Sequence, residues 1–192
     1  HKALEIATRR QVEKPSPSNR VVIFVVGNQR ELRRVLDARS RTIAGMYVPR
    51  AGASRAFVQD IRNTRGYPHF STVILLHEYT HHFLISTSRF GMPRWLSEGA
   101  AEFFASAIFE SDGSIQIGLP AQHRAGELYY ADSVSTRELL DHELYERNRG
   151  RRYDAFYGRS WLLYHYLTFD ADRVGQLGAY WNRVRQGEGA LE

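Results

Sequence analysis

The stretch VILLHEYTHHFL, at residues 73–84, constrains the fold more than any other part of the sequence. In this apolar run, His77 and His81 lie four residues apart, and Glu78 follows the first histidine. Residues four apart in an α-helix lie one turn above each other on the same face. Burial of such polar side chains without partners costs roughly 1–3 kcal/mol each. The stretch therefore predicts a buried helix whose polar side chains share a specific partner.

The pattern His77-Glu78-x-x-His81 is the H-E-x-x-H motif, in which two imidazoles on one helix face bind a zinc ion and the glutamate acts as general base. A catalytic zinc takes three protein ligands and leaves one position open. A third ligand must therefore come from another part of the chain. His82 lies about 100° around the helix from His81. We expect it to be a surface or supporting residue and not a ligand.

The stretch PRWLSEGAAEFF, at residues 93–104, predicts a second helix that supplies the third ligand. Glu98 follows His81 after a break at Gly91, which lets the chain turn and return. Glu102 lies one helical turn beyond Glu98, where it can accept a hydrogen bond from a zinc-bound histidine.

These two stretches resemble the gluzincin metallopeptidases. That superfamily includes the thermolysin and M1 aminopeptidase clans, and the closest similarity is to the small peptidase MA-like bacterial domains. In gluzincins, H-E-x-x-H is followed on the next helix by W-L-x-E-G-x-A-E, which residues 95–102 match. The resemblance is close over residues 70–110, although the spacing between the two motifs is slightly shorter than in the large aminopeptidases. It implies zinc ligands at His77, His81 and Glu98, a general base and proton shuttle at Glu78, and a supporting carboxylate at Glu102.

A donor for the oxyanion is also implied by the resemblance. The stretch YGRSWLLYHYL, at residues 157–167, is similar to the later gluzincin helix that opens with the transition-state tyrosine. On that similarity Tyr157 is the expected donor. Tyr153, His123 and His165 remain alternatives. The segment AGMYVPRA, at residues 44–51, is a candidate edge strand on which an extended substrate could add to the sheet.

The rest of the pattern predicts an α+β fold, with a small N-terminal mixed sheet and helix followed by a mostly helical, gluzincin-type half. Residues 1–20 form a lead-in segment, and residues 21–192 form one peptidase MA-like domain with a sheet part (21–70) and a helical part (71–192). The expected strands are 21–26, 45–49 and 57–61, and the expected hairpin is 114–119. The expected helices are 29–39, 71–90, 93–107, 136–146, 157–169 and 171–186.

Composition excludes several other chemistries. The chain has no cysteine, which removes disulfides, thiolate metal sites and a cysteine nucleophile. Its formal charge of +5 comes from scattered arginines, so we expect a solvated surface and no nucleic-acid partner. No apolar run approaches the roughly 20 residues of a membrane span. The compartment stays open, and export is plausible if a signal peptide was removed before His1.

The predicted function is hydrolysis of peptide bonds by a zinc-dependent metallopeptidase, with a peptide or protein as substrate. The alternative is a catalytically silent binding module with the gluzincin fold. A purely structural metal site has no use for Glu78, which favours the enzyme.

Overall fold

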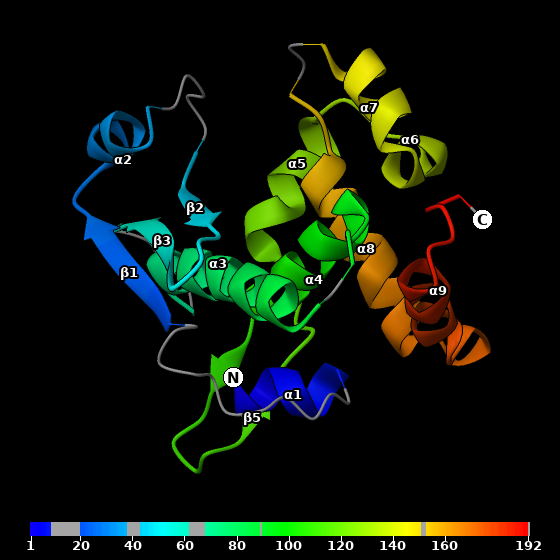
Figure 1. Ribbon diagram of the computed structural model, residues 1–192, viewed down its shortest axis with the longest axis horizontal. Helices are drawn as coiled ribbons and strands as arrows, with labels where there is room; N and C mark the ends of the chain where they lie inside the picture. Colours follow the sequence, from blue (N-terminus) through cyan, green and yellow to red (C-terminus); the bar gives the residue numbers. More distant parts are fainter. Residues whose placement is uncertain (9–19, 38–42, 62–67, 89, 151–152, 192) are drawn as a thin grey trace. The chain divides into compact units, whose positions relative to one another are not determined.

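The computed structural model describes residues 1–8, 20–37, 43–61, 68–88, 90–150 and 153–191. It has an α+β fold, in which a mixed three-stranded sheet with a helix is followed by a mainly helical region (Figure 1), as predicted. Contacts divide the chain into two compact units. The first comprises His1–Thr87 and Phe104–Ile117, and the second comprises Ser88–Phe103 and Gly118–Glu192.

The sheet of the first unit contains the three predicted strands. The strands are β1 (Arg20–Val26), β2 (Gly45–Val48) and β3 (Ala53–Gln59), and their order is β1-β3-β2. The central strand β3 pairs in parallel with β1 and antiparallel with β2. It begins at Ala53, before the expected residue 57, because the alternation of exposed and buried residues already starts at Ser54. The small polar side chain of Ser54 does not show this alternation in the sequence. The strand β2 is an edge of this sheet, as its predicted role requires.

The sheet of the first unit contacts helices α2 (Gln29–Val35) and α3 (Phe70–Thr87). In helix α2, Asn28 caps the N-terminus and Leu32 is fully buried. Helix α3 carries the H-E-x-x-H motif and packs on β2 and β3 (Figure 1). Helix α1 (Lys2–Thr8) was not predicted, because we interpreted residues 1–20 as a lead-in. Residues 9–19 of this lead-in lie outside the described residues.

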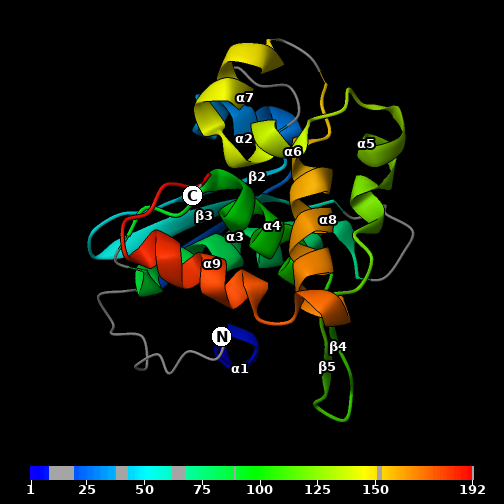
Figure 2. The ribbon, with the colours of Figure 1, turned by 90° about the vertical axis from the view of Figure 1, so that its right-hand side faces the viewer.

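A short hairpin completes the first unit (Figure 2). Its strands are β4 (Ile108–Phe109) and β5 (Ile115–Gln116), so it begins earlier than the predicted range 114–119. The turn depends on Asp112, whose carboxylate accepts a hydrogen bond from the Ser114 N–H at 2.8 Å. Gly113 follows with a positive φ of 86°. The turn residues Asp112 and Gly113 therefore define the position of the hairpin better than the apolar residues within 114–119.

Helices dominate the second unit. They include α4 (Arg94–Ala105, which extends past Phe103), η2 (Gln122–Arg124), α5 (Ala125–Tyr130), α6 (Thr136–Leu140), α7 (His142–Arg149), α8 (Phe156–Phe169), η3 (Ala171–Arg173) and α9 (Gln176–Arg185). The predicted helix 136–146 is two helices, because Asp141 has extended backbone and its side chain caps α7. The predicted last helix starts at Gln176, because Gly175 before it has a left-handed backbone conformation.

Helices α4 and α8 approach each other closely at Gly99. A Cβ atom at this position would lie 2.5 Å from the backbone oxygen of Ser160, so only glycine fits there. The other two atoms nearest to such a Cβ, Ser160 C and Tyr164 Cβ, also belong to α8. Within the described part of the chain, no helix combines the length and apolar character needed to cross a membrane.

Candidate metal centre

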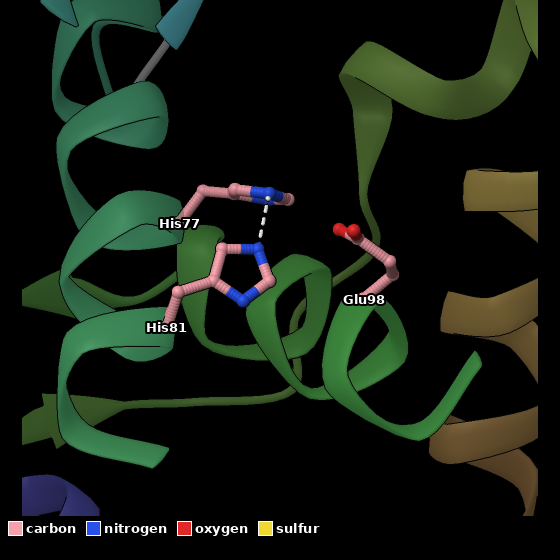
Figure 3. Close-up of side chains that lie close together, drawn as sticks. All are labelled: His77, His81 and Glu98. Atoms are coloured by element: carbon pink, nitrogen blue, oxygen red, sulfur yellow. Dashed lines mark hydrogen bonds between the residues drawn. The ribbon is translucent and has the colours of Figure 1, made fainter. Parts of the chain in front are cut away.

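The two histidines of the motif project from one face of α3 (Figure 3). Their Nε2 atoms are 3.1 Å apart, and the rings are nearly perpendicular at 79°. The helical repeat produces this arrangement, because it stacks His77 and His81 one turn apart. The separation suits an N–H of one ring donating to the other. It also suits two lone pairs directed at one cation.

Glu98 of α4 completes the group. Among the described residues, His77, His81 and Glu98 form a possible metal site, since they offer ligand atoms that all lie within 4.8 Å of one another (Figure 3). All three side chains are half-buried. The motif spacing on the two helices predicted these three residues.

The donor set fits zinc. Two imidazoles and one carboxylate are among the ligand sets of catalytic zinc sites, which keep a fourth position open. Two nitrogens bound tetrahedrally to zinc at about 2.05 Å would be roughly 3.3 Å apart. The observed 3.1 Å between the Nε2 atoms is close to that value. The chemistry of the group supports zinc without identifying the metal.

Glu78 lies on α3 against the edge strand β2. Its side chain is 6% exposed. A Cβ atom at Gly45, the first residue of β2, would lie 2.7 Å from Glu78 Oε1 and 2.5 Å from Ile74 Cγ2. The absence of a side chain at Gly45 therefore lets the edge strand come directly against the carboxylate of the motif.

His82 is buried at 4% exposure and lies outside the possible metal group. Its Nδ1 is 3.1 Å from the Tyr47 hydroxyl, which in turn donates to Ser54 Oγ at 2.8 Å. Burial lowers the pKa of His82 and raises that of Tyr47. His82 therefore links α3 to β2 one turn beyond Glu78, in agreement with a supporting role.

Tyr157 lies in the first turn of α8 within the second unit. Burial raises the pKa of its hydroxyl, and the negative charge of Glu98 raises it further, whereas Arg94 and Arg124 lower it. The net shift is upward, so the phenol keeps its proton at neutral pH and can donate a hydrogen bond. The structure thus places Tyr157 within electrostatic reach of Glu98.

Arg94 stands at the first residue of α4 among aromatic rings. Its guanidinium carbon is 4.6 Å from the centre of the Phe156 ring, 5.3 Å from that of Tyr145 and 5.9 Å from that of Tyr157. Burial opposes its charge, but Tyr157 and Glu98 are among the groups that raise its pKa. Arg94 also donates to Glu146 at 3.1 Å. It keeps a positive charge beside Tyr157 and Glu98.

A buried polar network surrounds Glu102, whose side chain is fully buried. His123 Nε2 lies 2.6 Å from one carboxylate oxygen, and Arg124 donates to the other. Arg124 also donates to Glu127 at 3.0 Å, and its guanidinium carbon lies 4.7 Å from the centre of the Tyr157 ring. The predicted bond from Glu102 to a zinc-bound histidine stays a prediction.

Glu127 ties this network to α8. Its carboxylate accepts a hydrogen bond from the Gly158 N–H at 2.9 Å, and the residue is 4% exposed. Burial raises its pKa, while Arg124 opposes the shift. Arg124, Glu127 and Arg94 were not predicted from the sequence, and His123 was predicted only as an alternative oxyanion donor. Charged residues in a polar segment gave no periodic signal for this network.

The other two candidate donors have different surroundings. Tyr153 is 63% exposed, and His165 is 3.1 Å from the carbonyl oxygen of Gly118. His165 also lies within an aromatic cluster with Trp161 and Phe169. Neither has a described contact with Glu98, whereas Tyr157 interacts with it electrostatically.

The fold and this group of residues define an α+β protein with a possible His–His–Glu metal site. Residues 70–184 match DUF1570, a family described as a protein of unknown function. Because the match spans more than half of the chain, the protein belongs to the DUF1570 family. The matched span contains the possible metal site and Tyr157, whereas the three-stranded sheet precedes it. Neither the curated proteins nor the solved structures provide a match to this chain.

Proposed function

We propose that this protein is a gluzincin-type, zinc-dependent metallopeptidase. The observation that carries the proposal is the possible metal group of His77, His81 and Glu98, in a chain that also has a carboxylate at Glu78. His77, His81 and Glu98 would hold the zinc ion. Bound zinc supplies Lewis acidity, which polarises a carbonyl group and lowers the pKa of water to about 7.

Glu78 has the role of general base. It follows the ligand His77 by one residue on α3, and its carboxylate lies against the edge strand β2. A carboxylate in this position accepts the proton of the attacking water and then delivers it to the leaving amine. A purely structural metal site would not need this residue, which supports hydrolysis over binding alone.

Tyr157 has the role of oxyanion donor. Attack on an amide leaves negative charge on the carbonyl oxygen, and a fixed O–H donor stabilises that charge. The raised pKa of Tyr157 keeps its hydroxyl protonated, which supports the assignment. Arg94 and Arg124 hold positive charge near the phenol and add to the stabilisation of an anion there.

The edge strand β2 has the role of substrate platform. It pairs with β3 on one side only in the described sheet, so its other side can add an extended peptide through backbone hydrogen bonds. Gly45 brings this strand against Glu78. A peptide bound to β2 would therefore pass beside the general base.

Replacement of Glu78 by glutamine tests the proposal. General acid–base catalysis contributes about 10²–10⁴-fold to rate, so E78Q should lose at least 100-fold in turnover of a mixed peptide library. Zinc content, measured by atomic emission, should stay equal to that of the parent. The matched control is E143Q, because Glu143 is exposed on α7 and its change should leave turnover unaltered.

The two possible failures have different meanings. A zinc-loaded parent protein that cleaves no peptide under varied pH would point to the alternative function, a silent gluzincin-fold binding module. An E78Q protein that cleaves as fast as the parent would overturn the role of Glu78. Mass spectrometry of the products distinguishes these outcomes and also shows whether the enzyme cuts within chains or at their ends.

A further inference from the structure

The first unit contains a cavity of about 310 Å³ beside the turn that joins β2 to β3. Such a volume is at the small end of ligand pockets, so it suits one side chain better than a whole cofactor. We call it the Arg50 pocket. Its lining residues are Tyr47, Pro49, Arg50, Ala51, Ser54, Ile85 and Ser86.

The lining of the Arg50 pocket favours an anion. Among the described residues, its lining has one cationic side chain, Arg50, and no carboxylate. Hydroxyl groups of Tyr47, Ser54 and Ser86 provide further polar atoms. A guanidinium binds a carboxylate through two parallel hydrogen bonds, which are stronger than bonds between neutral groups. An acidic side chain is therefore the occupant that this lining would recognise best.

The hydroxyl groups of Tyr47 and Ser54 are held in place by hydrogen bonds. Tyr47 donates to Ser54 Oγ at 2.8 Å, and the Arg50 N–H donates to the same oxygen at 3.4 Å. Tyr47 is also 3.1 Å from His82 Nδ1, so the pocket is tied to α3 as well as to the strands. These bonds fix the backbone of the β2–β3 turn and with it the start of the Arg50 side chain.

The position of the pocket relates it to the proposed reaction. The start of β2 lies against Glu78, whereas the pocket lies at the other end of β2 and includes Ser86. Ser86 follows Glu78 by eight positions on α3, which corresponds to roughly 12 Å along the helix. An extended peptide advances about 3.3 Å per residue, so 12 Å spans roughly three to four residues.

We propose that the Arg50 pocket is a specificity subsite for an acidic side chain of the substrate. It binds aspartate or glutamate three or four residues from the cleaved bond of a peptide extended along β2. This inference rests on the proposed peptidase function and deepens it by naming the substrate class. Arg50 is a binding residue for the substrate and takes no part in bond cleavage.

The test uses a family of quenched fluorescent peptides with the zinc-loaded protein. Each peptide carries a single glutamate at one position on a neutral background, and the reference peptide has glutamine there. We expect kcat/KM to be at least fivefold higher for glutamate at the third or fourth position on one side of the cut. Glutamate at other positions should give no comparable gain.

Arg50 variants identify the residue responsible. R50Q should reduce the glutamate preference to less than twofold, and R50E should favour lysine at that position. R55Q is the matched control, because Arg55 is exposed on β3 next to the buried Ser54 and points to the other face of the sheet. It changes the net charge equally and should keep the preference of the parent.

The outcomes separate the inference from the function on which it rests. Cleavage without an acidic preference, or with a preference that R50Q leaves intact, overturns the subsite and leaves the peptidase function standing. A stronger preference for an apolar residue at that position also overturns it. If the zinc-loaded parent cleaves none of the peptides, the proposed function fails and the subsite fails with it.

Discussion

Individual residues near the possible metal site have well-defined and different tasks. Tyr157 combines a buried phenol with two nearby arginines and the carboxylate of Glu98. Gly45 has no side chain, and this leaves room for the side chains of Ile74 and Glu78. A prediction about one substitution follows for each of these two residues.

Removal of the Tyr157 hydroxyl should affect turnover much more than binding. We expect Y157F to lower kcat by about 10²–10³-fold, because loss of one oxyanion donor has an effect of that size. KM and zinc content should change little. The control is Y130F, since Tyr130 is 88% exposed. A Y157F protein with the kcat of the parent would remove Tyr157 from the mechanism.

A methyl group at position 45 should disturb Glu78, the proposed general base. In G45A the new carbon would lie 2.5 Å from Ile74 Cγ2 and 2.7 Å from Glu78 Oε1, so β2 or Glu78 must move. We expect a loss of about 1–3 kcal/mol in the free energy of unfolding from overpacking. Turnover should fall by about 10²-fold, the typical effect of a misplaced catalytic group.

The control for this substitution is G126A, because a Cβ atom at Gly126 of α5 would meet nothing within 4 Å. Urea unfolding and peptide turnover are measured on both proteins. If G45A kept full stability and activity, the close contact between β2 and Glu78 would not matter for function.

At the scale of elements, the second unit joins three segments through Arg124. This residue of η2 binds Glu102 of α4, contacts Glu127 of α5 and packs on the Tyr157 ring of α8. Glu102 lies one turn after Glu98, so the network links the helix of a possible metal ligand to the helix of the proposed oxyanion donor. We infer that Arg124 positions these two helices.

Replacement of Arg124 should loosen that link. Lysine keeps the charge but cannot reproduce the forked hydrogen bonds of a guanidinium. We expect R124K to lose about 1–3 kcal/mol in the free energy of unfolding, because Glu102 and Glu127 lose partners. It should also lower kcat more than it raises KM. The control is R137K, since Arg137 is exposed on α6.

Alanine at position 124 should have a larger effect, because it leaves two buried carboxylates without their cation. Guanidinium ion added at millimolar concentration should then restore part of the kcat of R124A. A purely structural role for Arg124 predicts lost stability in R124K with an unchanged kcat. That result would contradict its positioning role.

Much of the arrangement of elements could be predicted from local patterns. The run VVIFVV predicted a strand, and β1 occupies Arg20–Val26. The same run predicted burial, which was wrong, because most residues of β1 are exposed. The H-E-x-x-H stretch lies on one long helix, α3, as its spacing requires. Predictions were wrong at the ends of helices and strands where a single side chain determines the boundary. Asp141 divides one expected helix into two, and the Asp112 turn moves the hairpin.

At the scale of the whole molecule, metal binding should stabilise the fold. The possible ligands come from two helices that are separated in sequence, α3 and α4. An ion that binds only the folded state adds about 2.7 kcal/mol at a free concentration of 100 times its Kd. We expect zinc to raise the Tm of chelator-treated protein, and H77A, H81A and E98A each to reduce that increase.

Calorimetric scans with and without zinc, together with zinc titrations, measure this effect. The control is E143Q, which should respond to zinc as the parent does. Equal zinc binding by the parent and by all three ligand variants would show that the ion binds elsewhere.

The sequence by itself determined local features of this protein, namely which side chains share one face of a helix. Helix geometry repeats every few residues, so the spacing of His77 and His81, and of Glu98 and Glu102, showed which side chains share a face. The tertiary structure alone decided which distant residues meet. It paired Glu102 with His123 and Arg124, set Gly45 against Glu78, and formed the Arg50 pocket from β2, β3 and α3. The physical reason is that these contacts depend on the path of the chain between segments, which no local periodicity encodes.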